Sequence, residues 1–349
     1  MDLRDALDIP VPAIVLAEGE FGEPAGKTAN GVVMHSEIFE PVAIVDSETA
    51  GQSPRDILER PSVPEVPIVA EIDEALDVNP SPEALVIGVA PAGGELPTDW
   101  VDGIQTAMRA GCDVVSGLHT FLGDDPTWTT LAQECDVRLF DVRKPPAAED
   151  LRVADGSVDE LDTPVALTLG TDCAVGKRTT TFELYRAAKQ RGLDAGWVAT
   201  GQTGIMVGAH RGTVVDRVPS DFTAGIVEQH VIDVANDHDI VFVEGQGALT
   251  HRAYSGVTLS ILHGAWPDAV VLVDDPTRER RVLFEQFPIA GVDTERELIT
   301  ALSEASVPAV STWGDPAVES ERYDVPVANV FEVDGADRLL DAVLEDIDQ

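Results

Sequence analysis

The sequence predicts an α/β protein whose two domains each contain a parallel sheet covered by helices. Apolar runs that suit buried strands alternate with helical segments along the whole chain, and this alternation is typical of parallel sheets. The length of 349 residues suits two domains of ordinary size. A glycine-bounded segment at 170–180 lies between a strand and a helix, which is the context of a phosphate-binding loop. We expect one domain over 1–150 and a second over 151–349.

The first domain is predicted from short apolar strands separated by helices. Two strands lead into the turns Gly88–Gly94 and Ser116–Thr120, at the edge where open parallel sheets bind ligands. The expected strands are Ala13–Ala17, Val42–Val45, Ile68–Val69, Ala84–Val89, Asp113–Ser116 and Arg138–Asp141. The expected helices are Pro54–Leu58, Asp99–Ala110 and Thr127–Gln133.

The second domain repeats this pattern after an acidic, weakly patterned segment at 147–163, which we interpret as a linker. The expected strands are Val165–Leu169, Ala195–Ala199, Ile240–Val243, Ala269–Val273 and Ala309–Ser311. The expected helices are Thr179–Arg191, Phe222–Asp237, Thr294–Glu304 and Gly335–Asp346.

The segment 170–180 carries the clearest chemical signal. Loop amides and a helix N-terminus that point at one spot favour an anion there, and a lysine adds a point charge. The residues predicted to hold the phosphates of a cofactor are Gly170, Thr171, Asp172, Cys173, Gly176, Lys177, Arg178 and Thr179. The match to the Walker pattern is imperfect, because Arg178 occupies the position of the Mg²⁺-binding hydroxyl. Thr179 comes one residue later, about 100° around the helix.

Further candidates follow other strands of this domain. Glu244 ends the strand 240–243, where a P-loop domain places a carboxylate that organises the metal, and it could instead act as a general base. His251 titrates near neutrality and could transfer a proton. The loop Thr200–Met206, which includes Gln202, suits a backbone cradle for a substrate. Arg217 and Arg252 are candidates for binding a carboxylate, as are Arg143 and Lys144 in the first domain.

The charge balance excludes some functions. With 63 acidic and 23 basic residues the net charge is −40, so the chain lacks the basic face that nucleic-acid binding needs. The acids are spread along the chain rather than gathered in one tail, which favours adaptation to a high-salt cytosol over an acidic interaction surface. Only four lysines occur, so a lysine retained in the loop at 170–180 is conspicuous.

The predicted setting is the cytoplasm. No apolar run is long enough to cross a membrane, and the N-terminus lacks the apolar region of a signal peptide. The three cysteines show no metal-binding spacing, and a reduced compartment is the simplest interpretation. We also expect a homo-oligomer.

At these residues the chain resembles the DUF1611 family, whose members include D-glutamate N-acetyltransferases. The resemblance covers nearly the whole chain, and its combination of segments is specific. The matching segments are Gly88–Pro97, Ser116–Pro126, Asp141–Pro146, Gly170–Thr180, Thr200–Met206, Asp216–Gly225, Val243–Leu249, Ala253–Leu262 and His263–Ala269. It implies a Rossmann-like N-terminal domain and a P-loop NTPase-like C-terminal domain.

A more distant similarity is to dethiobiotin synthetase, whose phosphate loop resembles Gly170–Lys177 and whose metal-binding segment resembles Val243–Gly245. Arg178 departs from that pattern and weakens the case for ATP-dependent chemistry.

Two enzymatic functions and one regulatory function remain open. The first is an N-acyltransferase that uses acetyl-CoA and an acidic amino acid such as D-glutamate, with the loop holding the CoA phosphates and Glu244 or His251 as base. The second is an ATP- and Mg²⁺-dependent kinase or ligase acting on a small carboxylate, in which Thr179 and Glu244 organise the metal. The third is a nucleotide-binding regulatory module.

Overall fold

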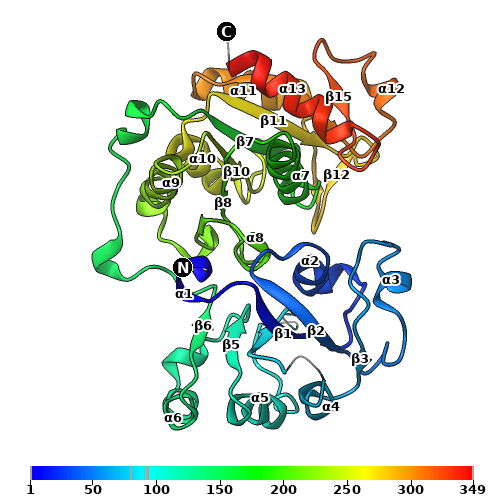
Figure 1. Ribbon diagram of the computed structural model, residues 1–349. Helices are drawn as coiled ribbons and strands as arrows, with labels where there is room; N and C mark the ends of the chain where they lie inside the picture. Colours follow the sequence, from blue (N-terminus) through cyan, green and yellow to red (C-terminus); the bar gives the residue numbers. More distant parts are fainter. Residues whose placement is uncertain (1, 79–80, 90, 92–93, 348–349) are drawn as a thin grey trace. The chain divides into compact units, whose positions relative to one another are not determined.

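The computed structural model describes residues 2–78, 81–89, 91 and 94–347, which form two compact units (Figure 1). The first unit comprises residues 1–145 together with 202–208, and the second comprises 146–201 together with 209–349. Within the described ranges, no helix combines the length and apolar character that crossing a bilayer requires. The predicted turn at 88–94 includes residues 90, 92 and 93, which lie outside the described residues.

The first unit contains a six-stranded parallel sheet in the order β3-β2-β1-β4-β5-β6, the strand order of a Rossmann fold. Its strands are β1 (Val11–Leu16), β2 (Phe39–Val45), β3 (Ile68–Val69), β4 (Ala84–Ile87), β5 (Asp113–Ser116) and β6 (Leu139–Asp141). Its helices are α1 (Leu3–Ala6), α2 (Lys27–His35), α3 (Pro54–Ile57), α4 (Ile72–Leu76), α5 (Val101–Arg109), α6 (Pro126–Cys135) and α8 (Gln202–Val207).

The core of the first unit is built by its central strands and by α4, α5 and α6. Strand residues such as Ile14, Leu85 and Val114 pack in one cluster with helix residues such as Ile104 and Trp128. Strands buried on both faces explain why this part of the sequence reads as continuous apolar runs rather than alternating ones.

The second unit contains a seven-stranded parallel sheet in the order β15-β14-β11-β7-β10-β8-β9. Its strands are β7 (Val165–Gly170), β8 (Ala195–Ala199), β9 (Arg211–Gly212), β10 (Ile240–Glu244), β11 (Ala269–Asp274), β14 (Ser306–Thr312) and β15 (Val327–Ala328). A separate antiparallel pair joins β12 (Arg280–Arg281) and β13 (Phe284–Pro288). Its helices are α7 (Lys177–Gln190), α9 (Ser220–Ala235), α10 (Ser255–Ala265), α11 (Val292–Leu302), α12 (Pro316–Glu319) and α13 (Gly335–Ile347).

Strand β7 occupies the middle of this sheet, paired with β10 on one side and β11 on the other (Figure 1). One apolar cluster joins the strands to α9, α10 and α11, and it includes Leu167, Leu262 and Ile299. Helix α7 contacts α13 and packs on β7, β8 and β10. The loop that follows β7 therefore lies at the carboxyl edge of a fully covered sheet, where ligands of parallel sheets bind.

The predicted fold class is confirmed, with two parallel-sheet α/β units. One local prediction is wrong: most of the expected loop at 200–206 is the helix α8. Ile205, Met206 and Val207 are buried, and the helix packs against α2. Its apolar side chains therefore favoured a buried helix over an open glycine turn.

Candidate functional site

The loop between β7 and α7 has the backbone of a phosphate-binding loop. Ala174 and Gly176 both adopt positive φ, of 53° and 93°, which turns the chain sharply before α7 begins at Lys177. A Cβ on Gly170 would lie 2.8 Å from Val175 Cγ2 and 2.9 Å from the Val273 carbonyl oxygen, so a larger residue does not fit there. The glycines at both ends of the predicted loop are thus explained by close packing and by backbone conformation.

Lys177 is buried at the start of α7, with 6% of its surface exposed. Its ammonium donates a hydrogen bond of 2.6 Å to the carbonyl oxygen of Asp172 within the same loop. Burial lowers the pKa of Lys177 to about 8, against the opposing influence of Asp172 and other nearby acids. A buried cation at a helix N-terminus strongly favours an anionic ligand.

A segment that the sequence did not single out fixes the loop from outside. Arg281 is 1% exposed, and its guanidinium donates to the Thr171 carbonyl oxygen at 2.8 Å and to Asp172 Oδ1 at 3.3 Å. The amide of Val282 donates to Asp172 Oδ2 at 3.0 Å. The guanidinium of Arg278 donates to the carbonyl oxygens of the two residues after Asp172, at 3.1 and 3.0 Å.

A sequence signal for this segment existed. Three arginines, Arg278, Arg280 and Arg281, lie within four positions of a chain that has few basic residues. Such a local excess of cations after a strand of an acidic domain indicates a role, because the surrounding composition disfavours it.

Two further contacts missed from sequence hold the ends of the loop. The Thr171 hydroxyl donates to Asp274 Oδ1 at 2.6 Å, at the end of β11. The Trp313 indole donates to the Val175 carbonyl oxygen, and a Cβ on Gly176 would meet its ring at 2.5 Å.

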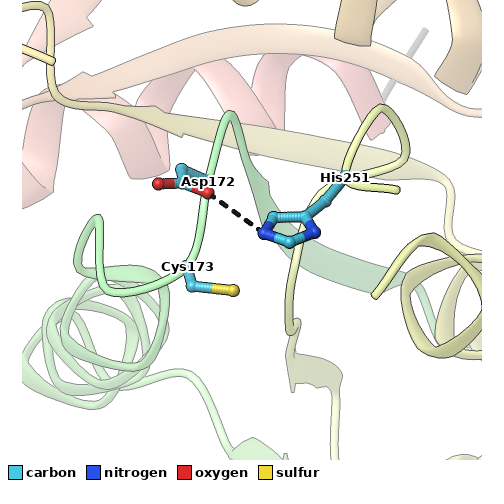
Figure 2. Close-up of side chains that lie close together, drawn as sticks. All are labelled: Asp172, Cys173 and His251. Carbon is cyan, nitrogen blue, oxygen red and sulfur yellow. Dashed lines mark ion pairs between the residues drawn. The ribbon is translucent and has the colours of Figure 1, made fainter. Parts of the chain in front are cut away.

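His251 lies next to the loop and is fully buried. Its Nδ1 accepts a hydrogen bond of 3.1 Å from the Ala253 amide, which places the proton of the neutral ring on Nε2. Nε2 is 3.7 Å from Asp172 Oδ1, beyond hydrogen-bond range, and has no hydrogen-bond partner among the described residues. Burial and the Arg281 charge lower the pKa of His251. The ring is therefore neutral near pH 7. Figure 2 shows one of its nitrogens turned towards Asp172 of the loop.

Asp172, Cys173 and His251 place potential metal-ligating atoms within 4.8 Å of one another (Figure 2). These residues fit a cation poorly. The His251 nitrogen nearest to Asp172 carries a proton, and both Asp172 oxygens accept hydrogen bonds from Arg281 or Val282. Lys177 and Arg281 add positive charge. The surroundings favour an anion over a metal ion.

Glu244 ends β10, the neighbour of β7, and is 7% exposed. Its Oε2 accepts a hydrogen bond of 3.3 Å from the Thr200 amide. Burial lowers the pKa of Arg178 while the Glu244 carboxylate raises it, so the two side chains are electrostatic neighbours. The guanidinium charge thus acts on the carboxylate that would organise Mg²⁺ in a nucleotide hydrolase. Thr179, the alternative hydroxyl, is partly buried on α7.

The residues predicted to bind the substrate carboxylate lie in different places. Arg252 is exposed next to His251, with its guanidinium 4.6 Å from the centre of the Phe287 ring. Arg217 is exposed in a short 3₁₀ helix, Val215–Arg217. Arg143 is buried and Lys144 is exposed in the first unit, and Gln202 begins α8 of that unit. The roles assigned to these residues remain predictions.

The fold and the site together define a class of protein in which one unit is Rossmann-like and the other is a P-loop unit. A family model described as "Domain of unknown function (DUF1611_N) Rossmann-like domain" matches residues 47–145. A second, described as "Domain of unknown function (DUF1611_C) P-loop domain", matches residues 152–340. The chain belongs to the DUF1611 family.

Individual relatives agree with this assignment. The crystal structure of a DUF1611 family protein from Anabaena variabilis has a TM-score of 0.84 and 34% identity, covering 96% of this chain and 99% of that one. A D-glutamate N-acetyltransferase from Tritonibacter scottomollicae is 36% identical over 223 residues, which span 64% of this chain and 65% of the relative. A protein of the same name from Pseudoalteromonas sp. is 36% identical over 235 residues, spanning 66% and 68%. The match thus spans just under two thirds of the first of these enzymes.

Proposed function

We propose that this protein is an N-acetyltransferase that transfers the acetyl group of acetyl-CoA to the amino group of an acidic amino acid resembling D-glutamate. The names of the two relatives at 36% identity support the activity. The observation that carries the proposal is the anion-favouring loop at 170–177, in which buried Lys177 lies at the N-terminus of α7 while Arg178 replaces the metal-binding hydroxyl. Such a loop suits the phosphates of CoA without needing Mg²⁺.

The chemistry requires a base, a carboxylate site and a way to stabilise negative charge. The amine nitrogen forms a bond to the acetyl carbon, the thioester C–S bond breaks, and CoA leaves as a thiol after gaining a proton. Of the two predicted bases, Glu244 is the better candidate, because both ring nitrogens of His251 are committed as an acceptor and a protonated donor. His251 Nε2–H is suited to donate to a developing negative charge. Arg252, exposed next to His251, is a candidate for the acceptor carboxylate.

The activity is tested with purified protein, D-glutamate and either acetyl-CoA or ATP·Mg²⁺. We expect release of the CoA thiol that depends on D-glutamate, without formation of ADP. Formation of ADP that depends on a carboxylate substrate, without thiol release, would replace this proposal with the kinase or ligase function. That second function draws support from one observation, the position of Glu244 at the end of the strand adjacent to β7.

We also propose that the protein works as a homo-oligomer in a cytosol of high salt. The net charge of −40 supports the second point, because self-repulsion is screened as ionic strength rises. Unfolding when salt is removed would support it, whereas an unchanged melting temperature in dilute buffer would contradict it. Size-exclusion chromatography with light scattering in high salt tests the oligomeric state.

A further inference from the structure

The Cys173 thiol lies inside the loop that we propose to hold phosphates. Its sulfur, a ring nitrogen of His251 and a carboxylate oxygen of Asp172 lie within 4.8 Å of one another. Figure 2 shows Cys173 and Asp172 on the same loop, with the imidazole of His251 beside both. The carbonyl oxygen of Cys173 accepts a hydrogen bond from Arg278 at 3.1 Å, so the backbone at this residue is held in place.

A second observation points to a negatively charged group at this position. His251 Nε2 is fully buried, carries the ring proton and has no hydrogen-bond partner within the described part of the chain. Asp172 Oδ1, 3.7 Å away, is beyond hydrogen-bond range, and a buried donor of this kind is rare unless a ligand completes it. A thiolate, or a group attached to the sulfur, would lie where this donor can reach it.

Cys173 lies beside the buried cation Lys177 and shortly before the N-terminus of α7. The thiolate and the ammonium of Lys177 attract each other, which raises the pKa of Lys177 against the effect of burial. Arg281 lies 3.3 Å from Asp172 and offsets that carboxylate. Glu244 and Glu295 act on Lys177 more weakly than Cys173 and Asp172 do. Cations and a helix N-terminus are the conditions that make a cysteine reactive.

The other two cysteines provide internal references. Cys112 is buried in the first unit, where burial and the nearby Asp113 and Glu83 raise its pKa to about 11. Cys135 is partly buried, as Cys173 is, but it ends α6 rather than preceding a helix. A comparison of Cys173 with Cys135 therefore separates the effect of the loop from that of exposure.

We propose that Cys173 is a modification site, at which a low-molecular-weight disulfide attaches reversibly and occupies the anion site of the loop. The Cys173 thiolate attacks one sulfur of the disulfide. A new S–S bond forms to Cys173, the original S–S bond breaks, and the second half leaves as a thiolate that takes a proton from water. Added thiol reverses the exchange, so the modification would block the binding of phosphate only under oxidising conditions.

The first test is limited labelling of the reduced full-length protein with iodoacetamide, read by peptide mass spectrometry at each cysteine. We expect Cys173 to react at least about tenfold faster than Cys135, because a neighbouring cation and a helix N-terminus activate a thiol. Cys112 should stay unlabelled. Equal rates at Cys173 and Cys135 would overturn the proposal.

The second test asks whether the modified thiol and the anion share one site. Inorganic pyrophosphate should slow labelling of Cys173 and leave Cys135 unchanged, and glutathione disulfide should add one glutathione at Cys173 and abolish pyrophosphate binding until dithiothreitol is added. Unchanged labelling in pyrophosphate, or unchanged pyrophosphate binding by the glutathione adduct, would contradict a shared site. Because neither test uses acetyl-CoA, both remain valid if the proposed acetyltransferase activity fails.

Discussion

Both units place a buried carboxylate where a strand ends, but the two carboxylates have different surroundings. In the first unit Asp46 follows β2 and accepts hydrogen bonds from the amides of Gly19, Phe21 and Glu48 and from the Thr49 hydroxyl. Each of its two carboxylate oxygens accepts two hydrogen bonds from the chain itself. Asp46 therefore links the loop after β1 to the loop after β2.

The equivalent edge of the second unit holds groups that the chain does not fully satisfy. Asp172 is held by Arg281 and Val282, but Lys177 is a buried cation, and His251 Nε2 has no partner among the residues the structure describes. The comparison of Asp46 with the loop at 170–177 indicates that a buried charge at a strand end is not by itself a sign of function. An excess of buried donors over acceptors is the better sign, because it costs free energy that a ligand would offset.

The largest expected effect tests the structural side of this comparison. Replacing Asp46 with alanine removes the acceptor of four hydrogen bonds, three of them from backbone amides, and should lower the free energy of unfolding by about 3 kcal/mol. Urea denaturation followed by circular dichroism measures this. Replacement of the exposed Glu48 by alanine is the control. A loss below about 1 kcal/mol for Asp46→Ala would show that Asp46 is not a structural tie.

At the loop of the second unit, the affinity for pyrophosphate and the stability should both depend on pH through the titration of Lys177. Since burial lowers its pKa to about 8, the affinity for pyrophosphate should fall as pH rises through about 8. The free energy of unfolding without ligand should change in the opposite direction. Between about pH 8 and 10.5 Lys177 is protonated in the unfolded chain but not in the folded one, so the stability should rise with pH in this window. Calorimetric titration and thermal melts on the wild type and Lys177→Met measure both. The same profiles in the variant would contradict the assignment to Lys177.

The strand, loop and helix at 165–190 could be predicted from sequence, because apolar runs and glycines mark them. The contacts of Arg278 and Arg281 with this loop could not be predicted, because β12 and β13 are short strands that lack apolar alternation. Helix α8 reads as a loop in the sequence, because its glycine at 204 and its polar start hide the buried residues that follow. The roles of the two His251 ring nitrogens, one an acceptor and one a protonated donor, depend on the tertiary structure. The local sequence therefore does not reveal them.

A smaller effect should follow from restoring the hydroxyl after Lys177. In Arg178→Thr the guanidinium that interacts electrostatically with Glu244 is replaced by a group that can bind Mg²⁺, so Mg²⁺ should strengthen ATP binding by about tenfold. In the wild type Mg²⁺ should bring no such gain. Titration of ATP with and without Mg²⁺ decides this, and Arg186→Thr on the same helix serves as control. Strong Mg²⁺ dependence in the wild type would favour the kinase or ligase function.

The smallest effect concerns Lys144 in the first unit. It pairs with Asp124 on an exposed surface, and such pairs contribute little, so Lys144→Met should change the free energy of unfolding by less than about 0.5 kcal/mol. Kinetics with D-glutamate test its predicted substrate role separately. A raised KM at unchanged stability would keep Lys144 as a carboxylate ligand, and an unchanged KM would make it a surface ion pair.

The central claim is that the loop at 170–177 holds the phosphates of acetyl-CoA, and equilibrium binding tests it most directly. Acetyl-CoA should bind the wild type in competition with pyrophosphate, and Lys177→Met should weaken this binding by about 1.5–3 kcal/mol, the range of a hydrogen bond to a charged group. The matched variant Lys189→Met, at an exposed position of the same helix, should bind as the wild type does. Equal affinity of the wild type and Lys177→Met for acetyl-CoA, without competition by pyrophosphate, would contradict the account.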